Sequence, residues 1–141
     1  MTIKCAFLGL GVMGYPMAGH LVKKGFEVTV YNRTIAKAQK WSQEYGAAFK
    51  ETAFEAVKDA DFVFACLGND DDVRSVVLGE SGAFAGMPPG AVFVDHTTDS
   101  ADLARELFAV CKKRGLGFLD APVSGGQAGA VNGVLTVMVG G

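Results

Sequence analysis

The pattern G-x-G-x-x-G fills residues 9–14, which read Gly9-Leu10-Gly11-Val12-Met13-Gly14. The apolar run IKCAFL at 3–8 predicts a buried strand before it, and Met13, Met17 and Leu21, spaced by four, predict a helix after it. In this setting the first glycine permits a tight turn, the second lets the backbone approach a pyrophosphate, and the third lets the helix pack closely on the sheet. Free N–H groups at the start of the helix then face the phosphate charge. The stretch predicts a dinucleotide-binding loop, with a glycine-rich turn that binds nothing as the alternative.

The rest of the chain alternates predicted strands with predicted helices. Short apolar or β-branched runs predict strands at 27–31, 61–67, 91–94, 117–119 and 134–139. Apolar periodicity and capping residues predict helices at 34–45, 52–58, 70–78 and 101–114, with N-caps at Thr34 and Ser100. This alternation, with strands that lack in–out polarity, predicts an α/β fold with a doubly wound, mostly parallel sheet. We expect residues 1–141 to form one dinucleotide-binding domain of the Rossmann type.

The composition is that of an ordinary globular domain. Half of the 141 residues are apolar, a fifth are charged, and the net charge is -2. Because Lys and Arg form no basic run, we expect no nucleic-acid partner, and because no apolar stretch approaches 18 residues, we expect no membrane span. The three cysteines are far apart, which favours reduced thiols in a cytoplasmic compartment. Neither His20 nor His96 has a Cys or His at ligand spacing, so we predict no metal site.

The residues that follow the second predicted strand favour NADP over NAD as the cofactor. An NAD site usually has an acidic residue here, because a carboxylate accepts hydrogen bonds from the ribose 2′-hydroxyl. Asn32 takes that position, and the guanidinium of Arg33 could bind a 2′-phosphate through a forked pair of hydrogen bonds. The hydroxyl and N–H groups of Thr34 could add donors. The alternative is that Arg33 is a solvated surface charge and Asn32 a turn residue.

The glycine pattern is one of several stretches that share a likeness to a single family. The others include Pro16-Met17-Ala18, Val76-Val77-Leu78-Gly79, Pro89-Gly90, Val94-Asp95 and, most specific, Asp120-Ala121-Pro122-Val123-Ser124-Gly125-Gly126. Together they resemble the β-hydroxyacid dehydrogenase family, which includes 3-hydroxyisobutyrate dehydrogenases, tartronate semialdehyde reductases and glyoxylate/succinic semialdehyde reductases. Asn32-Arg33-Thr34 is similar to the NADP-preferring branch of semialdehyde reductases.

The resemblance implies further contacts with the cofactor. Cys66-Leu67-Gly68 stands where the family usually has Met-Leu-Pro, and this backbone would pass over the adenosine side. Thr98 stands where the family has a Ser or Thr, near the nicotinamide ribose. His96 replaces the family's usual Met, which does no proton chemistry, so we favour a packed or hydrogen-bonded histidine over a catalytic one.

Ser124, Gly125 and Gly126 are the candidate substrate-binding residues. The predicted strand that ends at 119 delivers them to the carboxyl edge of the sheet, where doubly wound folds bind ligands. A serine hydroxyl and backbone N–H groups left open by glycines suit a carboxylate. The resemblance implies the same role, because the family's Ser-Gly-Gly holds the substrate acid group beside the nicotinamide. The alternatives are a nucleophilic serine, although Pro-Val-Ser-Gly-Gly is not the G-x-S-x-G elbow, and a plain flexible loop.

The resemblance implies reversible hydride transfer between NADP(H) and a small β-hydroxyacid or semialdehyde, of the 3-hydroxyisobutyrate, tartronate semialdehyde, glyoxylate or succinic semialdehyde type. The family donates the proton from a lysine in a G-x-x-G-x-G-x-x-x-K pattern after the Ser-Gly-Gly loop, and this chain has no such pattern. We therefore expect the lysine and the family's all-helical domain beyond Gly141, and a chain that binds cofactor with little or no turnover. The full-length protein would be a homo-oligomer. The alternative is a non-catalytic nucleotide-binding or sensor module.

Overall fold

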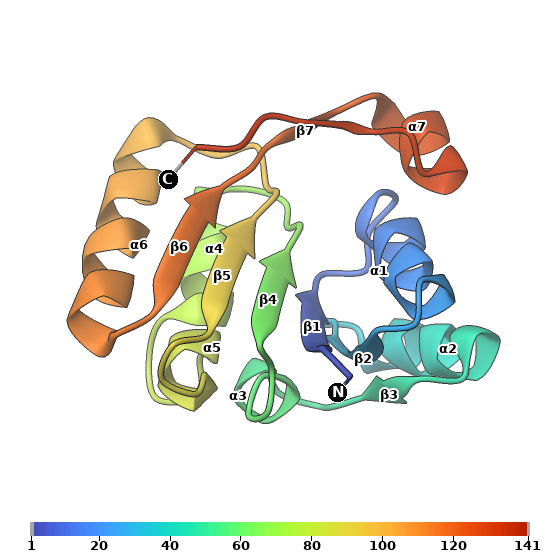
Figure 1. Ribbon diagram of the computed structural model, residues 1–141, viewed down its shortest axis with the longest axis horizontal. Helices are drawn as coiled ribbons and strands as arrows, with labels where there is room; N and C mark the ends of the chain where they lie inside the picture. The colour runs from blue at the N-terminus through green and yellow to red at the C-terminus, as the bar shows by residue number, and fades with distance from the viewer. Residues whose placement is uncertain (1, 141) are drawn as a thin grey trace.

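The computed structural model describes residues 2–140 and confirms the predicted α/β fold. Its centre is a six-stranded sheet (Figure 1) with the strand order β3-β2-β1-β4-β5-β6, in which all neighbours are parallel. The chain starts in the middle of the sheet and winds first to one edge and then to the other, so the sheet is doubly wound. The strands are β1 (Lys4–Leu8), β2 (Glu27–Tyr31), β3 (Ala48–Phe49), β4 (Phe62–Ala65), β5 (Val92–Asp95) and β6 (Gly117–Asp120).

Helices cover both faces of this sheet. Neighbouring residues of β1 point to opposite faces. Phe7 packs with α1 and α2 around the fully buried Trp41, whereas Leu8 belongs to the core beneath α3, α4, α5 and α6. Burial on both faces explains why this strand is a continuous apolar run. The helices are α1 (Gly14–Lys23), α2 (Ile35–Tyr45), α3 (Ala53–Ala56), α4 (Asp70–Val77), α5 (Ala83–Gly86), α6 (Ala101–Arg114) and α7 (Gly126–Asn132).

Side-chain caps fix where α4 and α6 begin. Ser100 Oγ accepts a hydrogen bond from the N–H of Leu103 at 3.0 Å, which confirms the predicted cap of α6. Asn69 Oδ1 accepts a hydrogen bond from the N–H of Asp72 at 2.9 Å, at the start of α4. Thr34 stands at the N-cap position of α2, as predicted, but its side chain makes no capping hydrogen bond. Within residues 2–140, no helix combines the length and the apolar character that crossing a membrane requires.

The chain beyond β6 does not add a further strand to the parallel sheet. The predicted strand at 134–139 is shortened to β8 (Thr136–Val137), which pairs antiparallel with β7 (Val123–Ser124). Val134 and Val139 are 71% and 63% exposed, so this run has a strand's composition without an apolar neighbour to pack on. A bridge between Asp120 and Gly140 ties the end of the run back to β6.

The sequence does not predict four short elements, namely β3, α5, α7 and β7. The first two have two and four residues, which is too short for an apolar period to be visible. The third lies in the stretch that we expect to be a loop, and its glycines, Gly126 and Gly129, lower the intrinsic helix propensity. The stretch after Ser124 is therefore corrected from a loop to a short helix.

Replacing Gly14 by Ala should destabilise the fold. A Cβ at this position would collide with the backbone oxygen of Gly9 and would lie 3.1 Å from Cε1 of Phe7, which is buried. Because a backbone oxygen gives way less easily than a flexible side chain, we expect the free energy of unfolding to fall by about 2–3 kcal/mol. Urea unfolding followed by circular dichroism measures the change.

Gly11→Ala is the matched control for this substitution. A Cβ on Gly11 meets no atom within 4 Å, so we expect its effect on stability to stay under about 0.5 kcal/mol. Equal stability of the two variants would show that the close approach at Gly14 does not hold α1 in position.

Candidate nucleotide-binding site

A pocket of about 420 Å³ lies at the carboxyl ends of β1, β2 and β4, the edge at which doubly wound sheets bind ligands. Every residue that the sequence predicts to contact the cofactor lines this pocket, with the exception of Thr98. The structure adds three residues that the sequence does not predict, Tyr31, Asp72 and Val76. The predicted residues in the lining are Gly9, Leu10, Gly11, Val12, Met13, Gly14, Asn32, Arg33, Thr34, Cys66, Leu67 and Gly68.

The three glycines of the loop have different surroundings, and these match their expected roles. Gly9 has a φ of 98°, and a Cβ there would collide with the backbone oxygen of Cys66. Gly14 leaves no room for a side chain against Gly9. The Cβ position of Gly11 is open, so a ligand can approach this backbone closely. The loop therefore fits a dinucleotide pyrophosphate.

Asn32 connects the end of β2 to the glycine loop. Its Oδ1 accepts a hydrogen bond from the N–H of Leu10 at 2.9 Å, and its Nδ2 donates to the carbonyl oxygen of Thr34 at 3.1 Å. The amide thus holds two parts of the pocket wall together. A carboxylate here could accept the first hydrogen bond but could not donate the second, so the side chain has a structural reason to be an amide.

Arg33 reaches across the pocket to α4. Its side chain is 69% exposed, and its Nη2 lies 3.4 Å from Oδ1 of Asp72 and 3.4 Å from Oγ of Ser75. Arg33 is the only Lys or Arg among the residues that line the pocket within the described part of the chain. A phosphate in this pocket would depend on this guanidinium and on backbone N–H groups for its positive partners.

The third wall of the pocket follows β4. The N–H of Leu67 donates to Oγ1 of the buried Thr97 at 2.9 Å, which fastens this wall to the loop after β5. Burial, with a smaller contribution from the charge of Asp95, raises the pKa of the Cys66 thiol to about 11. The thiol is therefore protonated at neutral pH and contributes surface rather than a nucleophile to the pocket.

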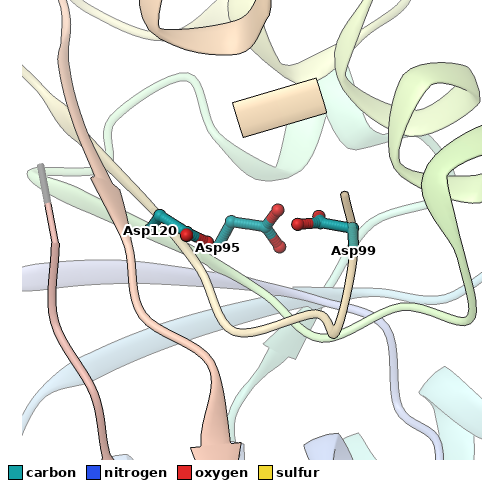
Figure 2. A group of neighbouring side chains, drawn as sticks. All are labelled: Asp95, Asp99 and Asp120. Carbon is teal, nitrogen blue, oxygen red and sulfur yellow. The ribbon is translucent and has the colours of Figure 1, made fainter. Parts of the chain in front are cut away.

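Three aspartates, Asp95, Asp99 and Asp120, gather near this edge of the sheet, although Asp120 is distant from the other two in the sequence. Asp95 ends β5 and Asp120 ends β6, opposite each other in the strand register. Figure 2 shows the carboxyl groups of Asp95 and Asp99 pointing toward each other. Carboxylate oxygens of all three lie within 4.8 Å of one another. This spacing would allow them to surround a hard cation, but an acidic cluster alone does not define a metal site, and we interpret it as a set of interacting acids.

Burial and the neighbouring carboxylates change the titration of Asp99 and Asp120. Burial, a hydrogen bond with Asp95 and the charge of Asp95 raise the pKa of Asp99 to about 8. Burial and the charge of Asp99 raise the pKa of Asp120. Asp95 is fully buried, and its Oδ1 accepts a hydrogen bond from the N–H of Thr97 at 3.0 Å, whereas its Oδ2 has no partner among residues 2–140. The raised pKa of Asp99 favours its protonated form at neutral pH, and a proton on this carboxyl group can be donated to the Asp95 oxygen.

His96 is packed and hydrogen-bonded. Its ring stacks on Phe64, with centroids 5.8 Å apart and 5° between the planes, and its Nδ1 lies 2.7 Å from the carbonyl oxygen of Ala121. Burial lowers the pKa of His96 and outweighs the opposing effect of this hydrogen bond. A neutral ring that donates from Nδ1 agrees with the structural interpretation made from the sequence.

The predicted substrate residues lie apart from the pocket lining. Ser124 ends β7, Gly125 has a φ of 129°, and Gly126 begins α7 with a φ of 62°. All three are exposed, as is Thr98 in the loop after β5. The hydroxyl of Ser124 and the backbone that follows it are therefore accessible to a small solute.

His20 fastens the end of α7 to α1, and Figure 1 shows these helices side by side. Its Nε2 lies 2.8 Å from the carbonyl oxygen of Ala130 and 3.0 Å from that of Val131. Both partners are acceptors, so Nε2 carries a proton and donates to them. The sequence offers no direct signal for this role, because the partners are backbone atoms about 110 residues away.

The loop, the pocket and the doubly wound sheet define a dinucleotide-binding domain. Residues 4–141 match the family described as the NAD binding domain of 6-phosphogluconate dehydrogenase. The chain belongs to this family of NAD-binding domains, and relatives named 3-hydroxyisobutyrate dehydrogenase confirm the resemblance inferred from its motifs.

Three similar proteins illustrate this relationship. An uncharacterized oxidoreductase of Shewanella frigidimarina (strain NCIMB 400) is 62% identical over 138 residues, which cover 98% of this chain and 47% of that protein. The solved structure of Mycobacterium tuberculosis 3-hydroxyisobutyrate dehydrogenase with L-serine is 38% identical, with a TM-score of 0.91, over 100% of this chain and 47% of that one. The structure of Psf3 in complex with NADP+ and 2-OPP is 29% identical, with a TM-score of 0.89, over 96% of this chain and 48% of that one. The chain thus spans about half the length of these relatives.

Asp99→Asn should flatten the dependence of stability on pH. An ordinary Asp titrates near 3.8, whereas Asp99 in the folded chain titrates near 8. Between these values the folded state binds more protons than the unfolded state, so this group makes stability fall as pH rises from about 4 to about 8. Asn does not titrate, and its amide can donate to Asp95, so the variant should be more stable than wild type at pH 8. We expect a gain on the order of 1 kcal/mol after screening by solvent.

Urea unfolding of both proteins at a series of pH values measures this effect. Asp59→Asn is the control, since it removes one carboxylate from an exposed position and should leave the profile parallel to that of wild type. An Asp99→Asn profile that is also parallel to wild type would show that Asp99 titrates normally.

Proposed function

We propose that this chain is the cofactor-binding part of an NADP-dependent oxidoreductase that transfers hydride between NADP(H) and a small β-hydroxyacid or semialdehyde. The observation that carries the proposal is the pocket in which the open backbone of Gly11 and the exposed guanidinium of Arg33 lie together. Two relatives support it, one solved with NADP+ and one with L-serine, a small carboxylic acid.

Each wall of the pocket would hold a different part of the cofactor. The glycine loop and the first N–H groups of α1 would bind the pyrophosphate. Arg33 and Thr34 would bind the 2′-phosphate, the backbone of residues 66–68 would cover the adenosine, and Thr98 would lie near the nicotinamide ribose. The bound nucleotide supplies or accepts the hydride, while the protein orients the reactants and excludes competing reactions.

The substrate would be held by its carboxylate at Ser124, Gly125 and Gly126. These residues offer a hydroxyl donor and exposed backbone at the edge of the sheet where the nicotinamide would lie. We propose that the proton-donating lysine and an all-helical domain follow Gly141 in the full-length protein, which would be a homo-oligomer. We also propose a cytoplasmic location, since the three separated cysteines are free thiols.

The purified chain should bind NADPH more tightly than NADH. Because a hydrogen bond to a charged group contributes about 1.5–3 kcal/mol, Arg33→Ala should weaken NADPH binding roughly ten- to hundredfold and change NADH binding by no more than about twofold. Calorimetric titration with each nucleotide measures both affinities. Arg105→Ala, which removes an exposed cation from α6, is the control and should change neither. Equal or tighter binding of NADH by the wild-type chain would contradict the assignment from Asn32 and Arg33.

This chain on its own should reduce semialdehydes at a negligible rate, because we place its proton donor beyond Gly141. Loss of NADPH absorbance in the presence of small semialdehydes is the measurement, with Ser124→Ala as the reference. Turnover by the wild-type chain above that of Ser124→Ala would refute the expectation.

A non-catalytic nucleotide-binding module would also show negligible turnover. The parent gene distinguishes the module from the enzyme: a reading frame that continues into a helical domain favours the enzyme, and a stop codon after Gly141 favours the module.

A further inference from the structure

The pocket contains an acidic side chain that the sequence does not predict there. Asp72, in the first turn of α4, lines the same pocket as Arg33, and the two come from opposite sides of β1. Nη2 of Arg33 lies 3.4 Å from Oδ1 of Asp72 and 3.4 Å from Oγ of Ser75. The guanidinium that would bind a 2′-phosphate therefore already has two partners across the pocket.

The backbone holds Asp72 in this position. Its N–H donates to Asn69 Oδ1 at 2.9 Å, and its carbonyl oxygen accepts a hydrogen bond from Ser75 Oγ at 2.9 Å. Its Oδ2 lies so close to Gly68 that a Cβ on this glycine would collide with it. The side chain of Asp72 is 33% exposed, whereas that of the neighbouring Asp71 is 95% exposed. Of these two acids, only Asp72 faces the pocket.

We infer that Asp72 is a specificity-determining residue for the cofactor and that it weakens the preference for NADP that Arg33 creates; this inference rests on the proposed function. A 2′-phosphate bound by Arg33 in its present position would lie beside a carboxylate of the same charge sign. If Arg33 instead turns away toward the phosphate, the phosphate has to displace Asp72 from the guanidinium. In both arrangements the carboxylate penalises NADP.

NAD does not carry this penalty. Its 2′-hydroxyl can donate to a carboxylate, as it does where an acidic residue ends the second strand of an NAD site. In this chain Asn32 holds that position, and its amide is engaged with Leu10 and Thr34. Asp72 supplies a carboxylate to the same pocket from α4 instead. Arg33 and Asp72 together therefore set the ratio of the two affinities, with NADP preferred by less than Arg33 alone would give.

Asp72→Asn in the whole 141-residue chain tests this inference, because it removes the charge and keeps the size of the side chain. Calorimetric titration should show NADPH affinity increased by about three- to tenfold and NADH affinity unchanged or lowered. Asp72→Ser, which also has an uncharged hydrogen-bonding side chain, should act in the same direction. Asp71→Asn is the matched control, since it removes the same charge from the same helix turn at a position that faces solvent. Circular dichroism confirms that each variant is folded.

The ratio of the NADPH and NADH affinities decides the outcome. A rise in that ratio of about threefold or more in Asp72→Asn, with no rise in Asp71→Asn, supports the role of Asp72. An unchanged ratio, or an equal change in both variants, overturns this role and leaves the proposed function standing. If the wild-type chain binds neither nucleotide, the proposed function fails and this inference fails with it.

Discussion

The close approach of α1 to the loop before it is the constraint on which most of the molecule depends. No side chain fits between Gly14 and the backbone of Gly9, and a second close approach occurs where a Cβ on Gly19 would collide with the ring of Tyr45. These contacts seat α1 against the sheet and beside α2, and its first N–H groups consequently face the carboxyl edge of the sheet. They also bring His20 within reach of the carbonyl groups at the end of α7. One packing constraint thus positions both the nucleotide loop and the segment that follows Ser124.

Charge at the same edge works against the binding of an anionic ligand. Asp72 lines the pocket, and Asp95, Asp99 and Asp120 stand within 4.8 Å of one another near it. Burial, together with this crowding, raises the pKa values of Asp99 and Asp120, and a raised carboxyl pKa lowers stability as pH rises. Arg33 and backbone N–H groups therefore have to supply the attraction for a phosphate. Proteins commonly accept such a loss of stability where they bind ligands.

The parts that the sequence predicts correctly depend on neighbours along the chain. The glycine loop, the boundaries of β2 and the Ser100 cap are examples, since each is decided within a few residues. The parts that it misses depend on how distant segments pair. Asp95 meets Asp120 only through the register of β5 and β6, and no spacing in the sequence reveals it. The run at 134–139 is predicted too long, because its β-branched residues favour an extended strand, whereas only Thr136–Val137 pairs as a strand, with β7.

The nucleotide pocket and the segment that carries Ser124 are held in place by different interactions. The nucleotide pocket is built on β1, β2 and β4, whose register is fixed by cores on both faces. The segment that carries Ser124 rests on a ribbon of two residues per strand, the bridge between Asp120 and Gly140, and the hydrogen bonds of His20. Opening that segment exposes little buried apolar surface, so it costs less free energy than opening the sheet. The nucleotide pocket therefore stands on the part of the chain that is harder to open, and the segment that carries Ser124 stands on the part that is easier to open.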